Sequence, residues 1–276
     1  MSEQKISIIT VNYNNCTGLE KTMSSVFSQS ATNIEFIVID GGSNDGSAKL
    51  LTQNTDKITY WISEPDKGIY HAMNKGINIA TGDYILFLNS GDWLYSDTVI
   101  SQSLTAMKEQ LDIYYGDIIY DEIHQQSKRV FPDQLNFAFF FEQNISHQAS
   151  FIKRTLFKTI FPYNENFKIV SDWEFFTYAI CKREASYKHL DIIITNYDAT
   201  GISSNTDNHV LMNAEREASL NNHFPEFIAD YNYFKHLRDK KTEQFLYIKQ
   251  HPLAYKFLKA FINLILLFLP KFKKSA

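Results

Sequence analysis

The chain has 276 residues, a mass of 32.1 kDa and a formal net charge of −4. Its 44% hydrophobic and 21% charged residues are ordinary values for a globular protein, which excludes the disordered and fibrous classes. The charge is unevenly divided, because residues 234–276 hold ten Lys and Arg against two acids, or +8, and leave −12 on the remainder, which argues against a nucleic-acid partner.

Short apolar runs alternate with helical patterns over the first hundred residues. The runs predict strands at 5–11, 34–39, 58–62 and 84–88, and apolar spacing predicts helices at 17–29 and 69–80. This alternation indicates an α/β fold with a mainly parallel central sheet flanked by helices.

The second half of the chain is less regular. It predicts strands at 112–120, 146–153 and 187–196, and helices at 172–181 and 208–223. A soft boundary falls near Phe224-Pro225. We therefore expect a main domain at 1–224 and a helical extension at 225–276.

Polar residues follow each of the first four predicted strands. They occupy positions 12–15, 40–47, 64–68 and 89–92. Ligands of parallel sheets bind beyond the carboxyl ends of the strands, so these four segments predict a binding site at one edge of the sheet.

Glycines follow the second strand, and the usual nucleotide motifs are absent. The sequence contains neither G-x-G-x-x-G after the first strand nor G-x-x-x-x-G-K-[ST], which weakens the case for common NAD enzymes and ATPases. Gly41, Gly42 and Gly46 would let the backbone turn tightly beside Asp40. That turn would expose the carboxylate to a nucleotide base or ribose, although the segment read alone is equally a plain loop.

Asn89-Ser90-Gly91-Asp92 forms a polar turn after the fourth strand. A carboxylate in this place is suited to a divalent cation that bridges two phosphate oxygens. Read alone, the tetrapeptide is more often a simple turn.

Six fragments occur in this order within about residues 5–205: ISIITVNYNN, EFIVIDGGSNDGS, SEPDKGIYHAMNKGI, ATGDYILFLNSGD, SHQASFIKRTLF and FKIVSDWEFF. Together they make the chain similar to the family 2 glycosyltransferases of GT-A fold, especially small bacterial enzymes of surface polysaccharide biosynthesis. The resemblance implies a Rossmann-like GT-A domain that binds a nucleotide-diphosphate sugar, with UDP favoured by family habit.

The resemblance also implies roles for individual residues. The donor-binding residues that it implies are Val11, Tyr13, Asp40, Lys67, Asn74, Ser90 and Gly91. Asp92 would hold Mg²⁺ or Mn²⁺, and Asp172 would act as the general base. His147 and Trp173 are candidates for the donor or acceptor pocket, although a lone histidine or tryptophan is often structural.

Three positions depart from the family pattern. Asn89 replaces the usual first acid of the D-x-D region, Gly91 stands where a further acid is common, and Ser171 replaces the Glu that usually precedes the base. Metal binding would therefore depend on Asp92 and the donor diphosphate. Asp172 also suits a helix start, so a capping role is an alternative.

These residues predict an inverting glycosyltransferase, transferring a hexosyl or N-acetylhexosaminyl group to a glycan or lipid-linked acceptor. Two rivals remain open. A nucleotidyltransferase would need an Arg-containing glycine-rich loop after the first strand, which NYNNCTG lacks. An inactive nucleotide-sugar-binding protein is suggested by Asn89 and Ser171.

The C-terminal segment predicts contact with a membrane. Residues 253–269 are apolar apart from Tyr255, Lys256, Lys259 and Asn263, and the last three mark one stripe of a helix. The segment is short for a span, and Lys271, Lys273 and Lys274 follow it, so residues 253–276 predict an interfacial helix. The alternative is a helix docked on the enzyme.

The cysteines and the N-terminal residues bear on the compartment. Cys16 and Cys181 form no disulfide framework and no metal-binding pattern, so reduced thiols are expected. No signal-peptide core precedes Asn12. We therefore expect a cytoplasmic protein at the inner face of the cytoplasmic membrane.

Overall fold

The structure is a computed structural model that describes residues 4–122, 125–199, 206–230, 233 and 240–270. Its strands form one sheet in the order β3-β2-β1-β4-β8-β6-β9-β5, with β7 paired to β6. The strands are β1 (Ile6–Asn12), β2 (Ile34–Asp40), β3 (Tyr60–Ser63), β4 (Tyr84–Phe87), β5 (Trp93–Leu94), β6 (Ile113–Glu122), β7 (Gln125–Arg129), β8 (Ser150–Lys153) and β9 (Tyr187–Asp198).

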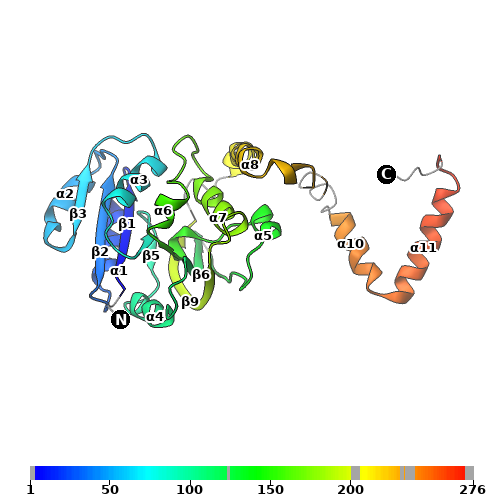
Figure 1. The fold of residues 1–276 in the computed structure, drawn as a ribbon, viewed down its shortest axis with the longest axis horizontal. Helices are drawn as coiled ribbons and strands as arrows, with labels where there is room; N and C mark the ends of the chain where they lie inside the picture. The colour runs from blue at the N-terminus through cyan, green and yellow to red at the C-terminus, as the bar shows by residue number, and fades with distance from the viewer. Residues whose placement is uncertain (1–3, 123–124, 200–205, 231–232, 234–239, 271–276) are drawn as a thin grey trace. The chain divides into compact units, whose positions relative to one another are not determined.

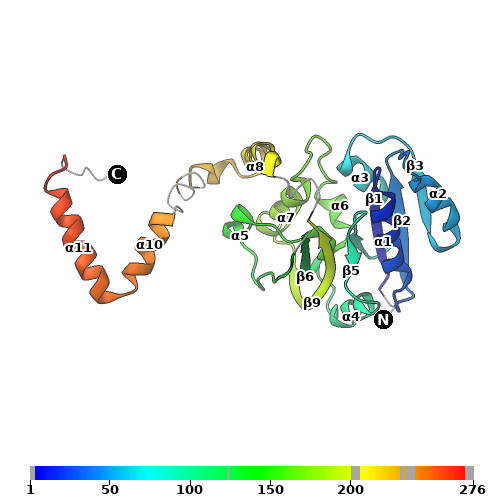
Figure 2. The same ribbon diagram turned by 180° about the vertical axis from the view of Figure 1, so that it is seen from behind.

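Helices flank the sheet. They are α1 (Cys16–Phe27), α2 (Ser47–Gln53), α3 (Ile69–Ile79), α4 (Val99–Ala106), α5 (Phe137–Glu142), α6 (Leu156–Thr159), α7 (Ser171–Cys181), α8 (His209–His223), α10 (Lys240–Lys249) and α11 (Pro252–Leu266). α1 contacts α2, whereas α3 packs on β1 and β2 from the other face (Figures 1 and 2). Right-handed crossovers require this division, because the chain steps outward from β1 to β3 and then returns to β4.

The parallel half of the sheet confirms the sequence prediction and places the polar strand ends together. β1, β2, β3 and β4 pair in parallel. The register sets Asn12 opposite Asp40, and Asp40 opposite Ser63. Three consecutive strands therefore end side by side in polar residues.

The second half of the sheet is mixed. β8 pairs antiparallel with both β4 and β6, and β6 pairs in parallel with β9. The predicted strand at 146–153 is shorter than expected, because His147–Ala149 forms a 3-10 turn before β8. The sequence prediction also missed α2, α4, α5, α6, β5 and β7, all eight residues or fewer, for which periodicity is weak.

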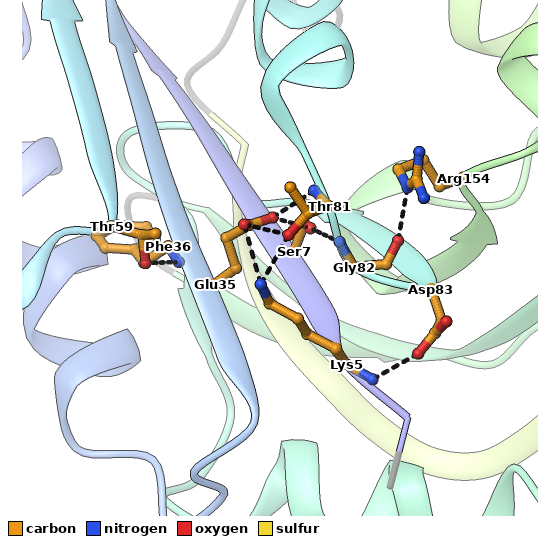
Figure 3. A network of polar contacts seen from close by, with 9 residues as sticks. All are labelled: Lys5, Ser7, Glu35, Phe36, Thr59, Thr81, Gly82, Asp83 and Arg154. Carbon is orange, nitrogen blue, oxygen red and sulfur yellow. Dashed lines mark hydrogen bonds and ion pairs between the residues drawn. The ribbon is translucent and has the colours of Figure 1, made fainter. Parts of the chain in front are cut away.

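A buried carboxylate joins β1, β2 and the turn before β4 (Figure 3). Glu35 Oε2 accepts hydrogen bonds from Ser7 Oγ (2.5 Å) and Thr81 N (2.7 Å), and its Oε1 accepts from Lys5 Nζ (3.1 Å). Burial alone would raise the pKa of Glu35, but these hydrogen bonds outweigh it and lower the pKa to about 2.

We expect Glu35→Gln to lower the free energy of unfolding by about 2 kcal/mol at neutral pH, since hydrogen bonds to a charged acceptor are lost. The folded-state pKa lies below the ordinary 4.5, so Glu35 stabilises the fold above pH 4.5 and this contribution is lost as the pH falls toward 2. Urea denaturation measures it. The gap between wild type and variant should shrink in acid, and an equal gap at neutral and acidic pH would contradict the assignment.

The chain divides into two units, Met1–Ala218 and Ser219–Ala276. The first unit contains the sheet, and the second contains α10 and α11, which contact each other through Phe245 and Tyr255 with ring centroids 6.2 Å apart. The predicted boundary between the main domain and the helical extension, after residue 224, stays a prediction.

Candidate active site

A cavity of about 1100 Å³ lies in the first unit beyond the carboxyl ends of β1 and β4. Seven of the predicted site residues line it: Val11, Tyr13, Ser90, Asp92, His147, Asp172 and Trp173. Four others do not: Asp40, Lys67, Asn74 and Gly91. The convergence of strand ends that the sequence predicted therefore forms a real cavity.

Tyr13, Gly41 and Gly42 line part of this cavity. Tyr13 is 67% exposed, which leaves its ring face open to a planar ligand. A Cβ on Gly41 would lie 2.5 Å from Asp66 Oδ2 and 3.1 Å from the Tyr13 ring, so glycine is required for this close approach. Asp66 was not singled out from the sequence, although it lies next to Lys67 in the donor segment.

Asp40 is buried at the end of β2 and does not line the cavity. Its carboxylate accepts hydrogen bonds from Asn12 Nδ2 (2.6 Å), Ser43 Oγ (2.6 Å) and Ser63 Oγ (2.5 Å). Burial alone would raise the pKa of Asp40, but hydrogen bonds from Ser43, Ser63 and Asn12 lower it. Asp40 is thus an ionised group that ties three strand ends together.

Lys67 and Asn74 lie outside the cavity lining. Lys67 is exposed before α3. The amide of Asn74 is used by a neighbouring loop, since it donates to Tyr163 O (2.8 Å) and Glu165 Oε1 (2.9 Å) and accepts from Tyr163 N (3.0 Å). The structure therefore shows Asn74 holding that loop, and its predicted contact with a donor stays a prediction.

Asp92 lies on the tight turn after β4, beside the end of β9. Its Oδ1 accepts a hydrogen bond from Asp198 N (2.8 Å), and Thr22 Oγ1 holds the turn by donating to Asp92 O (2.6 Å). Gly91 has φ +106°, and a Cβ there would lie 3.0 Å from Asp198 Oδ2. Glycine therefore permits both the turn and the close approach of the second carboxylate.

Burial raises the pKa of Asp92 to about 7, although the Asp198 N–H and the nearby His147 act in the opposite direction. Its side chain is only 4% exposed. The raised pKa means that the buried negative charge is poorly compensated by the protein alone. Asp198 also lines the cavity, two residues beyond the predicted end of its strand, and the sequence carried no signal for it.

The pair Asp92 and Asp198 fits a divalent cation that a ligand helps to hold. Within the described part of the chain, no three His, Cys, Asp or Glu side chains group closely enough to form a complete metal site. Two carboxylates supply only part of the oxygen ligands that such a cation takes, so phosphate oxygens of a bound ligand would complete the set.

Asp172 is placed by the start of α7 and by the loop before it. Glu215 of α8 anchors that loop by accepting hydrogen bonds from Lys168 N (2.7 Å) and Ile169 N (3.0 Å). Tyr70 Oη donates to Asp172 Oδ1 (3.1 Å), and Asn144 Nδ2 donates to Oδ2 (2.9 Å). The Asp172 side chain keeps 14% of its surface exposed, so it is held from several sides yet can be reached from the cavity.

His147 connects the turn after β4 with Asp172. Its Nδ1 lies 3.1 Å from Asp172 Oδ2, and its Nε2 lies 3.3 Å from Asn89 Nδ2. Trp173 is 3% exposed, with Nε1 donating to Phe140 O (2.6 Å) and the Arg216 guanidinium 5.1 Å from the ring centre. The contact of His147 with Asp172 and the packing of Trp173 are established only by the tertiary structure.

Comparisons with known proteins give consistent matches. The family model described as glycosyl transferase family 2 matches residues 7–161. A PGL/p-HBAD biosynthesis glycosyltransferase of Mycobacterium bovis is 30% identical over 212 residues, 75% of this chain and 81% of the relative. An uncharacterized glycosyltransferase of Mycobacterium tuberculosis is 32% identical over 231 residues, 81% of this chain and 87% of the relative.

Solved structures share the fold at low identity. S. aureus TarS in complex with UDP-GlcNAc has a TM-score of 0.62 at 16% identity, covering 80% of this chain and 67% of that chain. The mannosyltransferase PcManGT from Pyrobaculum calidifontis, with GDP-Man and Mn²⁺, has a TM-score of 0.60 at 13% identity, covering 83% and 65%. These likenesses confirm the predicted GT-A fold.

Proposed function

Because this chain belongs to glycosyl transferase family 2 and is a glycosyltransferase, we propose that it moves a sugar from a nucleotide-diphosphate donor, UDP-linked in our preferred reading, to a hydroxyl group with inversion at the anomeric carbon. The acceptor would be a glycan or a lipid-linked glycan in bacterial polysaccharide biosynthesis. Family membership decides against the nucleotidyltransferase, and the donor panel below tests the inactive binding protein.

One observation carries this proposal: Asp172 and Asp92 line the same cavity from different elements. Asp172 would take the proton of the acceptor hydroxyl as the new bond from oxygen to the anomeric carbon forms. The bond from that carbon to the phosphate oxygen breaks on the opposite face, and the nucleoside diphosphate leaves with the electron pair. One base suffices for this single displacement, whereas retention through a covalent intermediate needs a carboxylate nucleophile as well.

The donor would lie along the wall built by the strand ends. Val11 and Tyr13 would contact the base, and Ser90 and Gly91 the diphosphate. Asp40 is buried and already accepts hydrogen bonds from Asn12, Ser43 and Ser63, so it would act on the base through Asn12. Asn12 Oδ1 is buried in the cavity wall and has no hydrogen-bond partner among the described residues. Lys67 and Asn74 would border the donor segment.

Asp92, with Asp198 beside it, would hold Mg²⁺ or Mn²⁺. When bound, such a cation would neutralise charge on the leaving diphosphate. The poorly compensated charge of Asp92 supports this placement.

A panel of nucleotide sugars tests the proposal. We expect one donor class to be consumed in the presence of a glycan acceptor, and we expect NMR of the product to show the opposite anomeric configuration to that of the donor. Retention of configuration would overturn the inverting mechanism, and binding of donors without transfer to any acceptor would overturn the reaction itself.

The second unit supports a membrane-bound location for this reaction. In α11, Leu253, Phe257, Phe261 and Leu264 form an exposed apolar stripe, while Tyr255, Leu258 and Ile262 are half-buried. Lys256 and Lys259 are exposed between these faces, and Lys271, Lys273 and Lys274 lie outside the described residues. Among the helices that the structure describes, none has the length and apolarity needed to cross a membrane.

We therefore propose that residues 253–276 lie on an anionic lipid surface, at the inner face of the cytoplasmic membrane. The positive charge of the tail complements anionic headgroups, and each basic residue near the surface contributes about 1 kcal/mol. The exposed leucine and phenylalanine side chains would enter the acyl boundary. Such contact would bring the cavity to lipid-linked acceptors.

Deletion of residues 253–276 should release the protein from anionic vesicles in a sedimentation assay. Lys256→Ala/Lys259→Ala should weaken binding only in part and make it less sensitive to salt, because the apolar contribution is not screened. Neutral vesicles and thermal denaturation of the truncated protein serve as controls. Equal partitioning of the full-length and truncated proteins would show that the tail does not bind membranes.

A further inference from the structure

We propose that Asn89 and His147 are positioning residues which aim the carboxylate of Asp172 at the acceptor hydroxyl. The inference rests on the proposed function, since it takes Asp172 as the base. It gives a role to Asn89, which from the sequence alone is only a departure from the D-x-D pattern.

The hydrogen bonds of Asp172 leave its two oxygens unequal. Oδ2 receives two donors, Asn144 Nδ2 at 2.9 Å and His147 Nδ1 at 3.1 Å, while Oδ1 receives Tyr70 Oη at 3.1 Å. Each carboxylate oxygen can accept about two hydrogen bonds. Oδ1 therefore keeps capacity for one more, and the geometry assigns it as the oxygen that takes the acceptor proton.

The contact with Oδ2 determines which nitrogen of His147 carries the proton. An ionised carboxylate only accepts hydrogen bonds, so Nδ1 must be protonated. In the neutral ring Nε2 then carries a lone pair, and it faces the amide nitrogen of Asn89 at 3.3 Å. Asn89 can donate to that lone pair and so stabilises the tautomer that supports Asp172.

The surroundings restrict the ring of His147. Its side chain is 13% exposed, and Phe87 of β4 packs against it at 86° with ring centroids 6.3 Å apart. The ring is therefore held by the apolar side of β4 and by polar partners at both nitrogens. An aspartate at position 89 would offer only acceptors to Nε2 and would oppose the tautomer that Asn89 stabilises.

Variants at position 147 separate the two nitrogens. The amide of asparagine can replace the Nδ1 donor, whereas the longer glutamine places its amide near the position of Nε2. We expect His147→Gln and Asn89→Leu to lower kcat by about 10–100-fold with little change in the donor KM, by analogy with the loss of other orienting partners. His147→Asn should be about ten times more active than His147→Gln, because the donor to Asp172 is restored. Equal activity of the two histidine variants would overturn the proposal.

Imidazole ¹⁵N NMR gives a readout that does not depend on turnover. Wild-type His147 should show the Nδ1–H tautomer, and Asn89→Leu should reduce that preference. A wild-type ring protonated at Nε2 and not at Nδ1 would overturn the proposed series of hydrogen bonds from Asn89 through His147 to Asp172.

The Asp172→Asn variant separates this inference from the proposed function. If Asp172→Asn keeps wild-type turnover, the base assignment and the proposed function fail. If Asp172→Asn is inactive while His147→Gln keeps wild-type kcat, only the positioning role fails. Unchanged thermal denaturation of each variant excludes unfolding as the cause.

Discussion

Asp172→Asn is expected to lower kcat by about 10²–10⁴-fold, because a positioned general base typically contributes that much to the rate. Donor binding should persist, since Asp172 lies at the start of α7 and the expected nucleotide contacts lie at the ends of β1 and β2. Single-turnover kinetics and calorimetric titration with the donor measure the two effects separately.

A matched control removes the same charge elsewhere. Asp191 is an exposed carboxylate on β9 that does not line the cavity, so Asp191→Asn should keep near-wild-type turnover. If Asp172→Asn behaves like Asp191→Asn, then Asp172 is only a structural residue of the helix start.

Asp92→Asn is expected to separate activity from stability. Loss of the charged metal ligand should lower kcat/KM by about 10²–10³-fold, since a bound cation stabilises the transition state by several kcal/mol. A chelator should inactivate the wild-type protein to a similar extent, and Mn²⁺ or Mg²⁺ should restore only the wild type.

The same substitution should stabilise the metal-free protein at alkaline pH. The pKa of Asp92 is about 7 in the folded state against an ordinary 3.8, so the folded protein binds this proton more tightly. The contribution of Asp92 to the free energy of unfolding therefore falls as the pH rises from about 4 to about 7. Above that pH the folded wild-type protein buries a charged carboxylate, which lowers its stability. The variant has a neutral amide at this position and does not carry this penalty. Thermal denaturation with a chelator at pH 5 and pH 8 measures this. A melting temperature of Asp92→Asn below that of wild type at pH 8 would contradict it.

Local patterns were enough to locate the parallel half of the sheet and the cavity at its strand ends. Strand runs of alternating or continuous apolar residues are encoded locally, and polar residues at their ends had to converge once parallel pairing was inferred. Val11, Tyr13, Ser90 and Asp92 line the cavity for this reason. Short elements such as β5 and α6 were missed because two to four residues carry too little periodicity.

Contacts between distant segments could not be derived from the sequence. Asp172 meets Asn144 and His147 because β8 enters the sheet antiparallel between β4 and β6, which carries the 144–147 segment to the start of α7. Tyr70 reaches Asp172 from α3. Asp198 reaches Asp92 through the pairing of β9 with β5. A sequence specifies which side chains are polar, but the partner of each buried polar group depends on strand order and crossover direction. The tertiary structure alone therefore decided which groups surround Asp172 and which carboxylate accompanies Asp92.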